Sequence, residues 1–183
     1  GKRSVDINVF YSQDFFMHAF LEKLRDRGID VSREYDFSVF VPDSLSACMV
    51  RWERPVQDVL NQVMKESDNL SAEALFCRLG AQATGKRYVS AKEGIAEINR
   101  MIKQLGHNPD RYKIADGCGI SNYDYLSPAL LVDFLKFAYS RTEVFRKLYK
   151  ALPVAGVDGT LKYRMKQSKA YKNVHAKTGS YTA

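Results

Sequence analysis

The sequence predicts an α+β fold that is rich in helix and contains only part of a β-sheet. Apolar residues recur at the i, i+3, i+4 and i+7 spacing that gives a helix one buried face, for example in residues 56–64 and 95–105. Segments with strand character are short and lie near the two ends, at residues 5–9, 37–41, 47–50 and 174–181. The last of these is cut short at Ala183, so we expect the natural protein to continue and the sheet to be incomplete here.

Length and composition fit one domain, or a large piece of one. A chain of 183 residues with 45% hydrophobic residues can bury one substantial core. It has no apolar run long enough to span a membrane and no signal peptide, so no transmembrane segment is predicted in this chain. The odd cysteine count and the scattered histidines predict neither a disulfide framework nor a metal site. No cofactor is expected.

The chain is basic, with a formal net charge of +7 and a pI near 9.3, which favours an anionic partner. Much of the excess lies late in the sequence, at Lys162, Arg164, Lys166, Lys169, Lys172 and Lys177. An acidic polymer, nucleic acid and a solvated basic face all fit this charge. No RNP motif, recognition helix or zinc finger is present, so nucleic acid is not the predicted partner.

The first two helices are predicted from their ends and their apolar faces. Ser12 is a candidate N-cap for a helix that carries several aromatic residues and that Gly28 ends. Pro55 suits the first position of the next helix. The inward face of that helix is predicted to be Val56, Val59, Leu60, Val63 and Met64.

A polar hinge at residues 66–73 separates this helix from another, which is expected to run from Ala72 until Gly80 stops it. The hinge contains Ser67-Asp68-Asn69. These residue types are the preferred helix N-caps, so the tripeptide alone is typical of a cap. The same arrangement, held between two packed helices, can also position a catalytic group.

Three further helices follow. Ser90 and Glu93 form a predicted capping box, and Gly106 lies just past the end of that helix. The tight loop at residues 116–119 is expected to need glycine conformations twice. Ser127-Pro128 starts the next helix, and Thr142 is a candidate cap for the last one.

Ser67-Asp68-Asn69 followed by Lys177-Thr178-Gly179 is the ordered pair of motifs found in serine acyl-transfer enzymes that act on penicillins. Each tripeptide arises by chance in roughly 3–5% of chains this long, and the ordered pair far less often. The residue types suit the chemistry. A lysine can bind a substrate carboxylate, a strand containing glycine lets the substrate backbone lie close, and a strand N–H can serve an oxyanion hole.

Four segments in order resemble the class C low-molecular-mass penicillin-binding proteins, a family of bacterial D-alanyl-D-alanine carboxypeptidases and endopeptidases. They are residues 67–75, 116–121, 152–161 and 175–179. The resemblance implies the serine β-lactamase/DD-peptidase fold, in which a helical lobe packs against an antiparallel sheet. It also implies peptidoglycan stem peptides and β-lactam antibiotics as partners, and an extracytoplasmic location in the bacterial cell envelope.

The resemblance assigns site residues as well. Ser67 would relay a proton, Asn69 would bind the substrate amide, and Lys177 would hold the terminal carboxylate. Thr178 would share that carboxylate, Gly179 would let the substrate lie close, and the Ser180 amide would complete the oxyanion hole. Asp68 is expected to hold the hinge. Cys118 stands where the family usually has serine.

The chain departs from the family in one respect. It contains no Ser-x-x-Lys motif, which supplies the nucleophile and its base in that family. We therefore expect a C-terminal fragment that is inactive alone. Residues 53–183 would be part of the catalytic domain, and residues 1–52 the end of an inserted region or the re-entry to that domain. The alternative is a non-catalytic peptidoglycan-binding envelope protein of the same fold.

Overall fold

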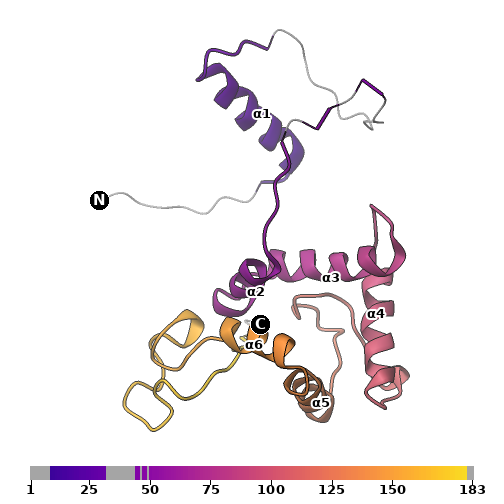
Figure 1. Ribbon diagram of the computed structural model, residues 1–183, viewed down its shortest axis with the longest axis vertical. Coiled ribbons are helices and arrows are strands. Elements are labelled where there is room, and N and C mark those ends of the chain that lie inside the picture. The colour runs from indigo at the N-terminus through magenta and orange to yellow at the C-terminus, as the bar shows by residue number, and fades with distance from the viewer. Residues whose placement is uncertain (1–8, 32–43, 46, 49, 181–183) are drawn as a thin grey trace. The chain divides into compact units, whose positions relative to one another are not determined.

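The computed structural model describes residues 9–31, 44–45, 47–48 and 50–180, in two compact units, Gly1–Arg51 and Trp52–Ala183 (Figure 1). The predicted strands at residues 5–9 and 37–41 lie outside the described residues, apart from Val9. Of the predicted strand at residues 47–50, the three described residues are exposed and not in a strand. Within the described ranges no strand forms, and β pairing is limited to two isolated bridges. The helix-rich fold class is confirmed.

In the first unit, helix α1 spans Ser12–Arg25. Ser12 is the first helical residue and not its cap, because Tyr11 occupies the N-cap position and makes no side-chain capping bond. Gly28 follows the helix in a left-handed conformation, φ 73°, and its N–H donates to the carbonyl of Arg25. The prediction that Gly28 closes this helix is therefore confirmed.

The second unit begins with α2, Val56–Lys65, and α3, Asn69–Thr84. Pro55 is the N-cap of α2 and lies one position before the predicted one. The hinge is shorter than predicted, since α3 begins at Asn69 and not at Ala72. The reason is the cap: the carboxylate of Asp68 accepts a hydrogen bond of 2.9 Å from the Ser71 N–H.

Gly80 does not end α3 as predicted, because its role is to let another helix approach. It lies against α4, Ala91–Gln104, where a Cβ atom on residue 80 would be 2.7 Å from the Cβ atom of Glu93. Helix α3 ends instead at Gly85, which has a φ of 68°. Figure 1 shows α4 turning away from the end of α3.

The capping box that opens α4 is confirmed. The Ser90 hydroxyl accepts from the Lys92 N–H at 3.3 Å, and the Glu93 carboxylate accepts from the Ser90 N–H at 2.9 Å. Gly94 faces the ring of Phe76, and an added Cβ would be 2.8 Å from that ring. Ile102 is fully buried.

The remaining helices are η1 (Pro109–Arg111), α5 (Pro128–Tyr139), α6 (Thr142–Ala151) and η2 (Gly159–Leu161). Ser127 caps α5 as predicted and accepts from the Leu130 N–H. Thr142 is the first residue of α6 and not its cap, since Arg141 holds that position without a side-chain bond. Helix α2 packs against α3 and α6, and α5 packs against α6. Together these contacts build one helical lobe.

The predicted C-terminal strand is reduced to a single antiparallel bridge, His175 with Val154. The backbone N–H groups of Ala155 and Ala176 extend this pairing by donating to Val174 and Pro153. Beyond Ala176, residues 177–180 have no strand partner among the described residues. None of the helices described is both long and apolar enough to cross a membrane.

Candidate active site

The turn between α2 and α3 places Ser67 in a left-handed backbone conformation, φ 58°. This conformation is uncommon for residues with a side chain and disfavours them by about 1–2 kcal/mol. The next residue, Asp68, caps α3, and the hydrogen bonds from Ser71 hold the pKa of Asp68 below its ordinary value. Capping is therefore done by Asp68, and the Asn69 amide has no hydrogen-bond partner in the described part of the chain.

Lys177 lies directly beside this turn. Its Nζ atom donates to the Oγ atom of Ser67 at 2.8 Å and to the carbonyl oxygen of Thr178 at 2.6 Å. Partial burial lowers the pKa of Lys177 below its ordinary value. The hydroxyl of Thr178 donates to the hydroxyl of Thr160 at 2.8 Å, which fixes the direction of its side chain.

These residues line one cavity of about 680 Å³. All six residues singled out from the sequence contribute to its wall: Ser67, Asn69, Lys177, Thr178, Gly179 and Ser180. The remaining wall is Cys118, Gly119 and Ile120. Two motifs that lie far apart in the sequence thus share a single polar cavity, with a hydroxyl, a free amide and an ammonium group facing the same space.

An ion pair links the end of α2, close to Ser67 in the sequence, to Asp158, the N-cap residue of η2. Lys65, at the end of α2, donates to the carboxylate of Asp158 at 2.5 Å and to the carbonyl of Leu152 at 3.1 Å. Burial raises the pKa of Asp158, but the bonds from Lys65 and the Val154 N–H outweigh this effect, and the net shift is downward. Lys65 and Thr160 could not be recognised as site residues from the sequence, because neither has a local signal that points to a distant partner.

The loop at residues 116–119 forms the third side of the cavity and is held from inside the lobe. The carboxylate of Glu73 on α3 accepts from the N–H groups of Gly117 at 2.8 Å and Cys118 at 2.9 Å. Only Gly119 is left-handed, with a φ of 77°. Gly117 is needed for a different reason than predicted, since a Cβ there would be 2.4 Å from the Cβ of Phe76.

Cys118 is half-buried where this loop meets the cavity, and burial raises the pKa of its thiol. Its sulfur lies near the carboxylates of Glu73 and Asp116, all within 4.8 Å of one another. Both carboxylates accept backbone N–H bonds from the loop itself. The cluster therefore serves to hold the loop in shape.

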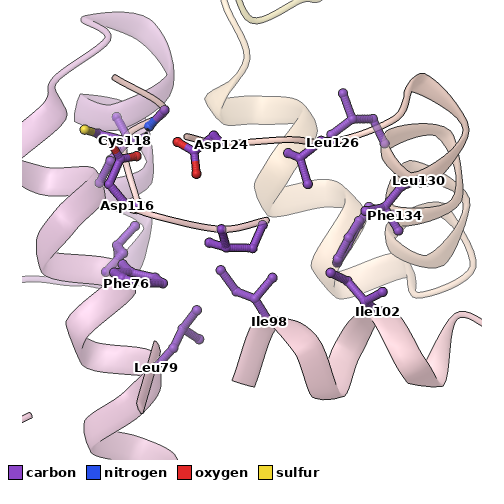
Figure 2. A pocket seen from close by; sticks show the side chains of 17 residues that line it. Phe76, Leu79, Ile98, Ile102, Asp116, Cys118, Asp124, Leu126, Leu130 and Phe134 are labelled. Atoms are coloured by element: carbon purple, nitrogen blue, oxygen red, sulfur yellow. Dashed lines mark hydrogen bonds between the residues drawn. The ribbon is translucent and has the colours of Figure 1, made fainter. Parts of the chain in front are cut away.

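A second, apolar cavity of about 450 Å³ lies on the other side of this loop and shares Cys118 and Gly119 with the polar one. Figure 2 shows Phe76 and Leu79 from α3, Ile98 and Ile102 from α4, and Leu130 and Phe134 from α5 around it. Leu79, which borders this space, is 50% exposed.

The fold and the arrangement of motifs define the class of protein, a partial, helix-rich domain of the serine β-lactamase/DD-peptidase fold. The chain belongs to the D-Ala-D-Ala carboxypeptidase 3 (S13) family, which it matches over residues 1–183. The family resemblance stated from the sequence is thereby confirmed.

Individual relatives agree with this assignment. The chain is 33% identical over 129 residues to the D-alanyl-D-alanine carboxypeptidase DacB of Haemophilus influenzae, covering 69% of this chain and 26% of that protein. It is 32% identical over 133 residues to the carboxypeptidase DacB of Mycolicibacterium smegmatis, covering 70% and 28%. The penicillin-sensitive carboxypeptidase A of Dictyostelium discoideum is 25% identical over 197 residues, covering 100% and 35%.

Among solved structures, the chain is similar to penicillin binding protein 4 of H. influenzae in complex with a β-lactam. The TM-score is 0.74 at 26% identity, over 96% of this chain and 40% of that one. The chain therefore spans only about a quarter to two fifths of the length of the relatives it matches.

Proposed function

We propose that the full-length protein is a serine-type D-Ala-D-Ala carboxypeptidase or endopeptidase that acts on peptidoglycan peptides through an acyl-serine, and that penicillins acylate the same serine. Family membership supports the carboxypeptidase activity. The observation that carries the finer proposal is the shared cavity, in which Ser67 and Asn69 face Lys177. Such an enzyme would work in the extracytoplasmic part of the bacterial cell envelope.

Each group in the cavity suits one step of this chemistry. Lys177 and Thr178 present a positive charge and a hydroxyl, which together bind a terminal carboxylate. The amide of Asn69, which has no hydrogen-bond partner among the residues that the structure describes, is available to a substrate amide. The Ser67 hydroxyl, which is hydrogen-bonded to Lys177, can pass a proton towards a leaving amine. The N–H of Ser180 at the cavity wall is our candidate for the oxyanion hole.

Within this chain the covalent step has no nucleophile, because no serine is followed by lysine three positions later. We propose that residues 53–183 are part of the catalytic domain, and that residues 1–52 belong to the end of an inserted region or to the re-entry into that domain. The nucleophile and its base would come from the part of the full-length protein that this chain does not contain, so the isolated chain would be inactive.

Labelling with a fluorescent penicillin tests the proposal. The full-length protein should become covalently labelled, and a short peptide ending in D-Ala-D-Ala should slow the labelling by competing for the cavity. The isolated chain should stay unlabelled. A full-length protein that binds peptidoglycan without labelling would overturn the enzyme proposal in favour of a non-catalytic binding protein. Labelling of the isolated chain would show that a nucleophile within it had been missed.

A further inference from the structure

The segment between η2 and the cavity is the most strongly charged part of the chain. Residues 159–180 contain six basic residues and no acidic one, whereas the whole chain has a net charge of only +7. Five of the six lie in residues 162–172, which we call the basic loop: Lys162, Arg164, Lys166, Lys169 and Lys172. All five are exposed, and none forms an ion pair within the part of the chain that the structure describes.

The basic loop has a defined shape. The N–H of Lys172 donates to the carbonyl of Ala155, and the N–H of Arg164 donates to Leu161. The ring of Tyr171 lies directly over Gly156, where a Cβ atom would be 2.5 Å from the ring. These contacts fix where the charges stand, so binding a partner would require little ordering of the loop.

The residues that flank the basic loop on both sides make contacts at the polar cavity. Thr160, just before it, accepts the hydrogen bond from Thr178 at 2.8 Å, and Lys177, shortly after it, donates to Ser67. The basic loop is therefore joined along the chain, on both sides, to residues at the cavity wall. This continuity favours a polymer that carries many negative groups.

The tyrosines of the basic loop bear on which kind of negatively charged polymer the loop would bind. Lys162 and Lys166 both lie over the ring of Tyr163, 5.5 Å and 5.1 Å from its centre, and Lys172 lies 5.2 Å from the centre of Tyr171. Both rings are therefore engaged in cation–π contacts with lysines of the loop itself. The loop also lacks the leucine, phenylalanine or tryptophan anchors that insert into a lipid surface. Exposed lysine and arginine side chains bind carboxylates by charge, and the stem peptides of the proposed substrate carry such groups.

We propose that the basic loop is a docking surface for polymeric peptidoglycan, binding carboxylates of stem peptides next to the one held in the cavity. This inference rests on the proposed function for the identity of the polymer. It makes the loop important for polymeric substrate and unimportant for small substrates or penicillin.

The experiment compares two full-length triple variants. The first, Lys162→Gln, Lys166→Gln and Lys169→Gln, neutralises half of the charge of the segment. The matched control, Lys92→Gln, Lys103→Gln and Lys150→Gln, removes the same charge from exposed lysines elsewhere in the second unit. Binding to purified peptidoglycan sacculi is measured by co-sedimentation over a salt series, and labelling by fluorescent penicillin is measured in parallel.

The loop variant should bind sacculi about eightfold more weakly at low salt, since each exposed ion pair contributes roughly a factor of two. Its binding should also depend less on salt. Its labelling rate should equal that of the wild type, and the control variant should match the wild type in both measurements. Equal sacculus binding by the loop and control variants would overturn the proposal. The basic loop would then be a solvated basic surface with no role in binding.

Two further results separate the alternatives. If the loop variant loses binding to vesicles of anionic phospholipid but keeps binding to sacculi, the partner is a lipid surface and the proposal is wrong. If the wild-type protein fails to label but its sacculus binding depends on the loop, the enzyme proposal fails and the docking surface stands.

Discussion

The Nζ atom of Lys177 lies 2.8 Å from the Oγ atom of Ser67, although 110 positions separate the two residues in the sequence. This single contact joins the helical turn to the C-terminal segment at the cavity. The lysine also donates to the carbonyl of Thr178, so its position is fixed from both walls.

Replacing Lys177 by alanine in the full-length protein should slow penicillin labelling by roughly 10- to 100-fold, because the lost hydrogen bond to the substrate carboxylate involves charged groups and is worth about 1.5–3 kcal/mol. Because burial lowers the pKa of Lys177, its ammonium group should lose its proton, as the pH rises, at a lower pH than the 10.5 that is ordinary for lysine. The alkaline fall in the labelling rate should therefore begin below that pH. In the Lys177→Arg variant this fall should occur at a higher pH, since arginine stays charged. Labelling of Lys177→Ala at the wild-type rate would contradict this role.

Ser67 allows backbone strain to be separated from chemistry. Both Ser67→Gly and Ser67→Ala remove the hydroxyl, so both should reduce labelling to a similar extent. Only glycine suits the left-handed turn, so the Gly variant should be more stable than the Ala variant by about 1 kcal/mol in denaturant unfolding. Equal stabilities would show that the turn relaxes when the side chain changes.

The capping box predicts a dependence of stability on pH. The hydrogen bond from the Ser90 hydroxyl, together with backbone N–H groups, lowers the pKa of Glu93 from 4.5 to about 2. A depressed carboxylate pKa stabilises the folded state fully above 4.5, and the stabilisation is lost as pH falls towards 2. In the Glu93→Gln variant, the free energy of unfolding should therefore decrease less than in the wild type as the pH falls from 4.5 towards 2.

Ser90→Ala provides the matched test of this cause, because it leaves Glu93 in place and removes the hydroxyl that holds its pKa down. In this variant the decrease in unfolding free energy over the same pH range should be smaller than in the wild type but larger than in Glu93→Gln. Parallel stability curves for the wild type and Glu93→Gln would contradict the assignment.

The thiol of Cys118 is predicted to react slowly with alkylating reagents. Burial raises its pKa, so little thiolate is present at neutral pH. Iodoacetamide should alkylate the exposed Cys48 before Cys118, as followed by mass spectrometry of the isolated peptides. Cys118→Ser should keep penicillin labelling, because the loop is held to Glu73 by backbone N–H groups and not by the thiol. Faster alkylation of Cys118 would identify it as an activated group.

Local patterns predicted those features that depend on neighbours in the sequence. The Ser90 and Glu93 capping box and the Ser127 cap need only residues within one helical turn, and both are found. Gly80 was misjudged because a glycine that ends a helix and one that admits a second helix have the same local signal. Its partner, Glu93, lies 13 positions later. The start of α3 was misplaced because several capping residues follow one another in the hinge.

The site was predictable only in part, for a similar reason. The order of the Ser-Asp-Asn and Lys-Thr-Gly motifs identified the residues that the cavity brings together, whereas the contacts that hold its walls depend on the folded chain. The bond between Lys65 and Asp158 is one such contact, and the bond between Thr160 and Thr178 is another. The predicted C-terminal strand failed because alternation along one segment does not supply a neighbour to pair with.

Phe76 occupies the space left by two absent side chains, that of Gly94 on α4 and that of Gly117 in the cavity loop. The residues at these three positions are therefore coupled. A larger residue at position 94 or 117 would fit only if residue 76 were replaced by a smaller one at the same time. Because Gly117 directly precedes Cys118 and Gly119, which line the polar cavity, an exchange between two helices would be transmitted to the wall of that cavity. Defects in activity are thus expected from changes that touch no polar group at all.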